Sequence, residues 1–491
     1  MGRSGAVAGL RLATLLWILP SCPSWGAKWG REERIVRSSN EEYPVPSISS
    51  TSQNLVVGPD GRLHLVWEDA PSGFSEVFYA SWVPGVDGPP VGTRVSGGQR
   101  ALKPTIGIHD GLIHVFWLEV GSPGTVLMHR SLGSGGWSAP ANLSSPHGSN
   151  APSIATGPTG LHVVYPRGVS GGTISIFHRR WELATGWSEQ EEVFNATQGG
   201  GEAFSVPSIC QDTEGTVHMV YRRCGEIIGG CQGHHILHRE WRPESGWEGT
   251  GRYIMPGDWP TITATDGGWV FLSAESGVSC CVGVAARDPA GQWHGRWLVQ
   301  FPELHPWPTQ SKLCPQGRGR VGLVASSGRD INDVYYALVD SFGNLDEMEN
   351  LSHSSVGAGV PCIASDASGT KHVVWTDRRH GWQELFYRGE LALPIAVGSG
   401  APGPVPRSAR AWPSPSSGPV TIELPAGRLG GSVEVFDVLG RRVRELGVVG
   451  SPLLTWDGKD GAGRDVGTGV YFLRVTTQGL VPSMHRVVLT R

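Results

Sequence analysis

The fold is decided by a short pattern that first reads Gly61-Arg62-Leu63-His64-Leu65-Val66-Trp67. It joins a glycine turn to an apolar segment with one histidine near its start and an aromatic residue at its end. Clear copies begin at Gly111, Gly160, Gly215 and Gly369, and two weaker copies carry Trp269 and Val321 in the histidine position. A period of about 50 residues with several short strands per repeat is typical of β-propellers. The sequence therefore predicts an all-β fold with a seven-bladed β-propeller over residues 33–392.

The composition agrees with many short strands joined by turns. The 491 residues include 71 glycines, 36 prolines and 20 tryptophans, and only 17% are charged. The glycines follow no collagen period, and the apolar and aromatic content excludes a disordered chain. A formal net charge of −4 argues against a nucleic-acid-binding protein, which usually carries a basic stripe.

Each repeat supplies four strands in order, and the last repeat lacks the fourth. The first strand starts at a Pro-x-Ile segment, the second holds the histidine, the third reads like Val77-Phe78-Tyr79, and the fourth follows a Gly-Trp pair. The seventh repeat stops after Arg388, whereas the N-terminal segment 34–38 resembles the fourth-strand segment 93–96. We expect this N-terminal strand to complete the seventh blade, which removes a free sheet edge.

The N-terminus indicates export. Arg3 and Arg11 flank a short apolar run, followed by Ser24-Trp25-Gly26, as in a secretory signal peptide over residues 1–26. The alternative is a lipobox, Leu19-Pro20-Ser21-Cys22, with Cys22 lipidated. No other stretch is apolar enough to span a membrane. We expect an extracellular or outer-surface protein that is monomeric.

The C-terminal part differs in composition. Residues 393–417 are rich in proline, glycine and serine and predict a semi-rigid linker. Residues 418–491 return to alternating strands, which predict a small β-sandwich. The expected strands are Val420–Leu424, Val433–Val438, Val470–Val475 and Arg486–Leu489.

Three segments of this tail resemble the FlgD-like Ig domain: 436–443, Trp456-Asp457-Gly458-Lys459-Asp460, and 469–472 with the ending 487–491. Residues 412–415 resemble the Pro-Asn-Pro that often precedes that domain, with Ser414 departing from it. The resemblance implies a C-terminal sorting domain of the type IX secretion pathway, with the export machinery as partner. It implies nothing about the propeller's activity.

Cysteines and histidines have structural interpretations. Cys224 and Cys231 bracket a glycine-rich stretch and could form a disulfide. Cys210 and Cys362 follow strand starts and suit buried positions. The repeat histidines share one position in different blades, so one packing hydrogen bond explains them all, and the Gly-Trp pairs suit packing between blades. The tail aspartates 457, 460 and 465 suggest a calcium loop, but we favour bonds to turn amides. We assign no metal and no cofactor.

Candidate ligand residues lie in the connections that leave one face of a propeller, between second and third strands and between the fourth strand of one repeat and the first of the next. The latter connections add Asp258, Trp259 and Trp307. These connections are rich in arginine, acid and tryptophan, which suits an extracellular glycan or protein ligand held by bidentate arginines. The alternative for Asp69 and Asp377, which match in the repeat, is that they cap turns. The candidates are Asp69, Arg167, Arg222, Arg223, Arg329, Asp377, Arg378 and Trp382.

Three functions fit this arrangement. The favoured one is carbohydrate or protein binding at the cell surface. The second is a glycoside hydrolase, because the chain resembles sialidase-like (BNR-type) β-propellers in having an arginine cluster. Against it, the S-x-D-x-G-x-x-W Asp box is absent, Arg34-Ile35 is followed by Val36 instead of proline, and no pair of carboxyls stands out. We therefore assign no catalytic residue. The third is a structural surface protein.

Overall fold

The chain divides into two compact units, Met1–Leu393 and Pro394–Arg491, in a computed structural model. All secondary structure in the described part is β, which confirms the all-β class. Within those same residues no helix is long and apolar enough to cross a membrane. The described residues are 29–38, 53–121, 124–144, 149–168, 174–194, 204–227, 230–275, 281–301, 311–317, 319–328, 331–391, 410–412, 416, 418–423, 432–437, 441–448, 453–476 and 483–490. The predicted signal peptide, Cys22 and most of the predicted linker lie outside them.

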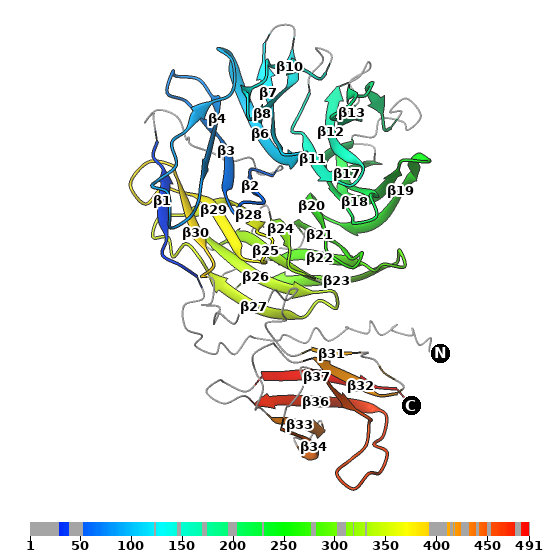
Figure 1. The fold of residues 1–491 in the computed structure, drawn as a ribbon. Coiled ribbons are helices and arrows are strands. Elements are labelled where there is room, and N and C mark those ends of the chain that lie inside the picture. The colour runs from blue at the N-terminus through cyan, green and yellow to red at the C-terminus, as the bar shows by residue number, and fades with distance from the viewer. Residues whose placement is uncertain are drawn as a thin grey trace, which may run out of the picture. The chain divides into compact units, whose positions relative to one another are not determined.

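The described strands of the first unit form seven antiparallel sheets, numbered here in chain order (Figure 1). Sheet 1 holds β2 (Leu55–Val57), β3 (Leu63–Asp69), β4 (Glu76–Trp82) and β5 (Thr93–Arg94). Sheet 2 holds β6 (Arg100–His109), β7 (Leu112–Val120), β8 (Thr125–Gly133), β9 (Gly136–Trp137) and β10 (Ala141–Asn142). Sheet 3 holds β11 (Ser153–Gly157), β12 (Gly160–Gly168), β13 (Ile174–Glu182), β14 (Gly186–Trp187) and β15 (Glu191–Glu192).

The remaining sheets have four strands each. Sheet 4 holds β16 (Phe204–Gln211), β17 (Val217–Ile227), β18 (Gly230–Arg242) and β19 (Gly246–Pro256). Sheet 5 holds β20 (Asp258–Ala264), β21 (Val270–Glu275), β22 (Cys281–Arg287) and β23 (Trp293–Gln300). Sheet 6 holds β24 (Lys312–Pro315), β25 (Arg320–Ser327), β26 (Asp333–Asp340) and β27 (Leu345–Asn350). Sheet 7 holds β28 (Ala358–Ser365), β29 (Lys371–Asp377), β30 (Glu384–Gly389) and β1 (Glu33–Val36).

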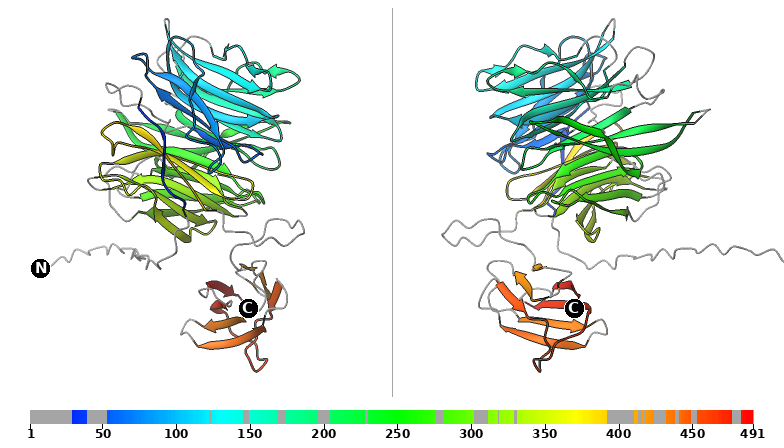
Figure 2. Two further views of the ribbon diagram at one scale, coloured as in Figure 1. Left: turned by 60° about the vertical axis from the view of Figure 1, so that its left-hand side comes forward. Right: turned by 90° about the vertical axis from the view of Figure 1, so that its right-hand side faces the viewer.

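Sheet 7 combines the two ends of the unit. The N-terminal strand β1 pairs antiparallel with β30, with Arg34 opposite Phe386 and Val36 opposite Leu385. The first strand of each sheet contacts the first strand of the next, and β28 of sheet 7 contacts β2 of sheet 1. The seven sheets thus follow one another in a closed cycle, and their twist is visible in the side views (Figure 2).

The apolar cores lie between neighbouring sheets. One cluster joins sheets 7 and 1 through Ile35, Leu65 and Cys362, and another joins sheets 6 and 7 through Tyr336 and Trp375. In β3 and β29, the second strands of sheets 1 and 7, almost every residue is buried, including the histidine and the final aspartate of each strand. Because every core is shared, no sheet can bury its apolar faces alone.

The second unit is a pair of sheets around its own core. One sheet holds β31 (Arg410–Trp412), β32 (Val420–Glu423) and β35 (Leu453–Trp456), and the other holds β34 (Arg442–Val448), β33 (Ser432–Asp437), β36 (Gly469–Thr476) and β37 (Ser483–Leu489). Both contribute to one apolar cluster, which includes the buried Trp456. Three strands differ from the sequence expectation: β31 lies within the expected linker, and β34 and β35 were not expected as strands.

Candidate functional site

The repeat histidines lie on the second strand of their sheets and bond to the third strand of the same sheet. His64 Nδ1 lies 2.7 Å from the Tyr79 hydroxyl. Burial lowers the pKa of His64 to about 4, so its ring is neutral near pH 7. The packing hydrogen bond expected from the sequence is confirmed. The other pairs are His372–Tyr387 at 2.9 Å, His114–His129 at 3.0 Å, His162–His178 at 2.9 Å and His218–His238 at 3.1 Å.

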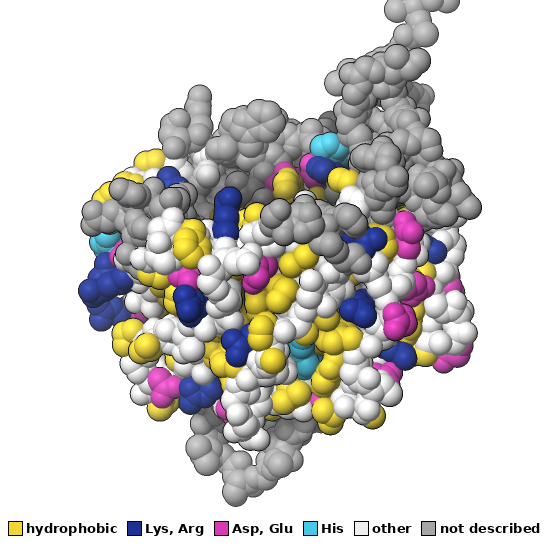
Figure 3. Space-filling view, turned by 90° about the horizontal axis from the view of Figure 1, so that it is seen from above, with side chains coloured by type: hydrophobic (Ala, Val, Ile, Leu, Met, Phe, Trp, Pro, Cys, Tyr) yellow, Lys and Arg dark blue, Asp and Glu magenta, His cyan; other side chains and the backbone are white. Residues whose placement is uncertain are grey.

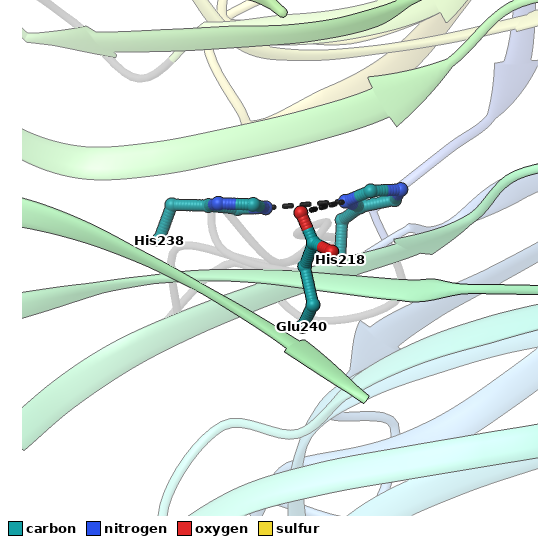
Figure 4. A group of neighbouring side chains, drawn as sticks. All are labelled: His218, His238 and Glu240. Carbon is teal, nitrogen blue, oxygen red and sulfur yellow. Dashed lines mark hydrogen bonds and ion pairs between the residues drawn. The ribbon is translucent and has the colours of Figure 1, made fainter. Parts of the chain in front are cut away.

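One of these pairs sits beside an acid, in a group that could geometrically hold a metal ion: His218, His238 and Glu240 (Figure 4). The Trp293 indole N–H donates to His238 Nδ1 at 3.4 Å. An indole can only donate, so Nδ1 accepts and Nε2 of His238 carries the hydrogen. That Nε2 then donates to His218 Nδ1, and His218 Nε2 donates to Asp212 at 3.0 Å. The two ring nitrogens near Glu240, His218 Nδ1 and His238 Nε2, are therefore already hydrogen-bonded to each other.

Glu240 is also engaged elsewhere. Its two oxygens lie 2.7 Å from Arg287 and 2.6 Å from Arg242. The same histidine pairing recurs in sheets 2 and 3, which makes it a feature of the repeat. A metal ion would have to displace two guanidinium groups from Glu240 and break the hydrogen bond between the two histidines. We therefore interpret these three residues as part of the packing of the sheets and not as a metal site.

The tryptophans near the start of the fourth strands pack edge-on against the preceding sheet. Trp187 lies 5.1 Å from His129, measured between ring centroids, and Trp247 lies 5.3 Å from His178. Trp247 also donates its N–H to His178 Nδ1 at 3.3 Å. These indoles therefore pack between sheets, as the sequence predicted.

Two of the predicted ligand residues are buried and used in turns. Asp69 accepts a hydrogen bond from the Ala70 amide at 2.8 Å. Asp377 accepts from the Arg379 amide at 2.9 Å and from the Ser354 hydroxyl at 3.2 Å, and its second oxygen bonds the Arg379 guanidinium. Their side chains thus support the turn-capping alternative.

Arg167 is held against its own sheet. Its guanidinium carbon lies 3.9 Å from the centroid of the Phe177 ring, a cation–π contact. Its Nη1 donates to Gln190 at 3.4 Å. A ligand would therefore have to bind Arg167 through the parts of its guanidinium that Phe177 and Gln190 do not contact.

The remaining predicted residues do not form one described cluster. Arg378 is exposed and donates to Gln383 at 3.1 Å, and Trp382 is 44% exposed. Arg223 follows Arg222 in β17. Arg329 lies outside the described residues.

Arg222 is the predicted residue around which polar groups from two sheets converge. Its Nη1 lies 2.9 and 2.8 Å from the two carboxylate oxygens of Asp258 in sheet 5. His234 Nδ1 lies 2.7 Å from Asp258 Oδ2. The three side chains are 25%, 19% and 39% exposed, in the order Arg222, Asp258 and His234. We call these three residues the Arg222 cluster.

A tight connection places Asp258 in this cluster. Gly257 is the single residue between β19 and β20, and its amide donates to the His234 carbonyl at 2.9 Å. A Cβ at this position would lie 2.5 Å from the Glu275 carbonyl oxygen. Only glycine permits so close a backbone approach.

Glu275 adds a second carboxyl beside the Arg222 cluster. It ends β21 and lies opposite Asp258 in the strand register. Burial, with the negative charge of Asp258 as a second cause, raises the pKa of Glu275 to about 8. Glu275 is therefore mainly protonated near pH 7, next to a carboxylate held by an arginine. Glu275 has no distinctive sequence signal, because the burial that raises its pKa and the neighbouring Asp258 both come from packing in the folded chain.

A repeated backbone feature was also missed. A residue immediately before the first-strand proline has a positive φ in four sheets, where the register with the second strand shifts. Proline has no N–H to donate to the neighbouring strand, so a β-bulge forms at that point. The prolines in the sequence were therefore the signal for these bulges. A positive φ in a β-branched residue is a strained outlier. The residues are Lys103, Val206, Trp259 and Val360.

Among the described cysteines, Cys281, Cys314 and Cys362 are buried, whereas Cys210 is partly exposed. Cys362 belongs to the core between sheets 7 and 1, as its small apolar character suggested. The side chains of Cys224 and Cys231 lie outside the described ones, so that disulfide stays a prediction.

The aspartates of the C-terminal tail bond turn amides. Asp457 accepts from the Lys459 amide at 3.0 Å. Asp460 accepts from the amides of Ala462 and Arg464, both at 2.9 Å. These bonds agree with the favoured interpretation over a calcium loop.

One face of the molecule shows how the charges are distributed (Figure 3). Basic side chains lie at several separate places on this face, with acidic side chains between them. This mixture agrees with the small net charge of −4.

Comparisons with known proteins give a fold but no family. No family model matches the chain, and no curated protein matches it. An ulvan lyase from a new polysaccharide lyase family is 11% identical with a TM-score of 0.51, over 70% of this chain and 92% of that one. At this identity, the likeness shows a shared fold alone.

Two further structures match more weakly. A Trypanosoma rangeli sialidase is 10% identical, with a TM-score of 0.43 over 93% of this chain and 88% of that one. PorZ, a surface component of the type IX secretion system of Porphyromonas gingivalis, is 14% identical, with a TM-score of 0.40 over 91% of this chain and 61% of that one. At these scores neither carries an argument.

Proposed function

We propose that the first unit is a seven-bladed β-propeller over residues 33–392, closed by β1, and that residues 418–491 form a FlgD-like Ig domain. The closed cycle of sheet contacts and the pairing of β1 with β30 support the propeller. The motifs around Phe436, Trp456 and Tyr471 support the C-terminal domain. With a signal peptide over residues 1–26, this organisation suits export by a type IX-like pathway to the outer cell surface.

We further propose that the propeller binds a glycan. The observation that carries this proposal is the Arg222 cluster, in which a guanidinium, a carboxylate and an imidazole from two sheets converge and stay partly exposed. Such a set can both donate to and accept from sugar hydroxyls, and arginine can hold a sugar carboxylate through two parallel bonds. The ulvan lyase of the same fold is described as bound to a sulfated glucuronate–rhamnose unit, and acidic glycans are our first candidates.

A glycan array of neutral, uronate-containing and sulfated oligosaccharides tests this function. We expect at least one glycan to bind and Arg222→Ala to weaken it by about tenfold or more, because a charge-assisted hydrogen bond contributes about 1.5–3 kcal/mol. The matched control is Arg62→Ala, which removes a partly exposed arginine that pairs with Asp87 at 3.0 Å outside the cluster. Binding that both variants retain would contradict the proposed site, and an array without any bound glycan would contradict the function.

Glycan cleavage is the second candidate, and Glu275 favours it. A carboxyl that stays protonated near pH 7 beside a carboxylate is the arrangement from which an acid and a base can be drawn. If the protein cleaves a bound glycan, reducing ends should appear with the native chain and not with Glu275→Gln. If the protein binds a glycan and no reducing ends appear, cleavage is contradicted and only the binding function stands.

A further inference from the structure

A pocket of about 360 Å³ lies at the turn ends of sheets 2 and 3, with one residue from sheet 4. The β6–β7 turn supplies His109 and Asp110, the β11–β12 turn supplies residues 158–160, and β13 supplies Arg180 and Glu182. Pro243, just beyond β18, completes the lining. Gly160 begins β12 and Arg167 lies near its other end, so this pocket is at the opposite end of the strand from that predicted ligand residue.

The turns that form the pocket are held in place. Asp110 and Gly111 have φ values of 47° and 72°, as in a two-residue hairpin turn with both central residues left-handed. The Thr159 amide donates to Gln211 at 3.0 Å, and its hydroxyl donates to the Gly215 carbonyl at 3.1 Å. Both bonds join sheet 3 to sheet 4, so the shape of the pocket is built into the sheet contacts.

Two polar contacts join the charged and titratable side chains of the pocket. Arg180 Nη2 lies 3.0 Å from Glu182 Oε1, and His109 Nε2 lies 3.4 Å from Asp110 Oδ2. Arg180, Glu182 and Asp110 are 33%, 41% and 44% exposed, so each can still reach a ligand. An incoming anion would find the guanidinium already paired and two carboxylates facing it, which disfavours phosphate, sulfate and uronate ligands.

A neutral polyhydroxylated molecule suits this lining better. Its hydroxyls can donate to the carboxylates and accept from the guanidinium without adding a charge. The rings of Pro158 and Pro243 offer apolar surface to the C–H face of a sugar ring. A volume of about 360 Å³ is near the lower limit of small-molecule sites, which suits one or two sugar units.

We propose that this pocket is a second carbohydrate site, which binds a neutral sugar at the turn ends of sheets 2 and 3. It does not depend on the Arg222 cluster, which belongs to sheets 4 and 5 and for which acidic glycans are the first candidates. Two sites of different charge preference on one chain would let it contact a mixed polysaccharide at two separate points.

Saturation-transfer NMR on the full-length chain tests the pocket, with glucose, galactose, mannose, N-acetylglucosamine and their neutral disaccharides as probes at millimolar concentration. At least one probe should receive saturation, and its affinity should fall by about tenfold or more in Glu182→Gln and in Arg180→Gln. The matched control is Asp87→Asn. It removes the negative charge from another arginine–carboxylate pair, Arg62–Asp87 at 3.0 Å, which lies outside the pocket. Melting temperatures close to that of the native chain verify that the variants are folded.

The outcomes separate this proposal from the proposed function. Sugar binding that is lost in Glu182→Gln and retained in Arg222→Ala and Asp87→Asn supports the pocket, whatever the glycan array shows. Binding that survives Glu182→Gln and Arg180→Gln, or that is lost in Arg222→Ala alone, overturns it. Absence of saturation transfer to every probe also overturns it, while leaving acidic-glycan binding at the Arg222 cluster intact.

Discussion

Glu275 shows how a residue acquires its chemistry from neighbours that are distant in sequence. Its partner Asp258 comes from the tight connection at Gly257, and the arginine that holds Asp258 comes from β17. The sequence could identify Arg222 as a candidate because charged residues after an apolar run are visible in one dimension, although the structure places Arg222 within β17 and not in the expected connection. It could not identify Glu275, since the burial that protonates this carboxyl arises from packing.

The pH dependence of stability should report this protonation. The folded-state pKa of Glu275, about 8, is above the unfolded value of 4.5, so the folded chain holds a proton that the unfolded chain releases. Its contribution to the free energy of unfolding is fully present below pH 4.5 and is lost as pH rises through 8. We expect Glu275→Gln to match the native chain in melting temperature near pH 5 and to exceed it near pH 8.5, by about 2–4 °C for each kcal/mol.

Thermal unfolding followed by circular dichroism across this pH range is the measurement. Glu182→Gln is the control, because this glutamate is exposed and shows no corresponding burial. Parallel curves for Glu275→Gln and the native chain would contradict a raised pKa.

At the scale of elements, apolar periodicity predicted most second and third strands but not all edge strands. The histidine-containing strands are nearly all buried, so their composition is distinctive. In contrast, the adjacent charged residues Arg444 and Glu445 interrupt the alternation in β34, and β31 has only three residues and precedes a proline-rich segment, so neither looks like a strand by itself. Such strands owe their conformation to pairing with a neighbour, which the sequence alone does not display.

The strand β1 should contribute to the stability of the whole first unit. Ile35 is only 4% exposed and packs in the core shared by sheets 7 and 1. We expect Ile35→Ala to lower the free energy of unfolding by about 2–4 kcal/mol, whereas Glu33→Ala on the exposed side of β1 should change it by less than about 0.5 kcal/mol. Urea titration followed by tryptophan fluorescence measures both. Equal midpoints for Ile35→Ala and the native chain would show that β1 does not support the fold.

At the scale of the whole molecule, the two units have separate cores. Among the described residues, the first unit distributes its apolar side chains over seven clusters that each join neighbouring sheets, whereas the second unit has one cluster. Loss of packing in one unit should therefore leave the packing of the other unchanged.

Calorimetry of the full chain should show this independence. Trp456→Ala removes a buried indole whose N–H donates to the Lys459 carbonyl at 2.9 Å, at an expected cost of about 3–5 kcal/mol to the second unit. Trp375→Ala is the matched variant in the first unit, where Trp375 is also fully buried. Each variant should lower one transition and leave the other in place, and a shift of both transitions by either variant would contradict separate unfolding.

The hydrogen bond from Trp293 to His238 crosses from sheet 5 to sheet 4, and the bond from Trp247 to His178 crosses from sheet 4 to sheet 3. A gene segment cut at the connections between sheets would therefore carry each histidine without its indole donor. The two partners lie 55 and 69 positions apart, farther than one repeat of about 50 residues, so a crossover at any other point of the repeat separates them as well. A duplicated repeat would therefore keep this bond only beside a neighbouring repeat that brings its own tryptophan to the matching position.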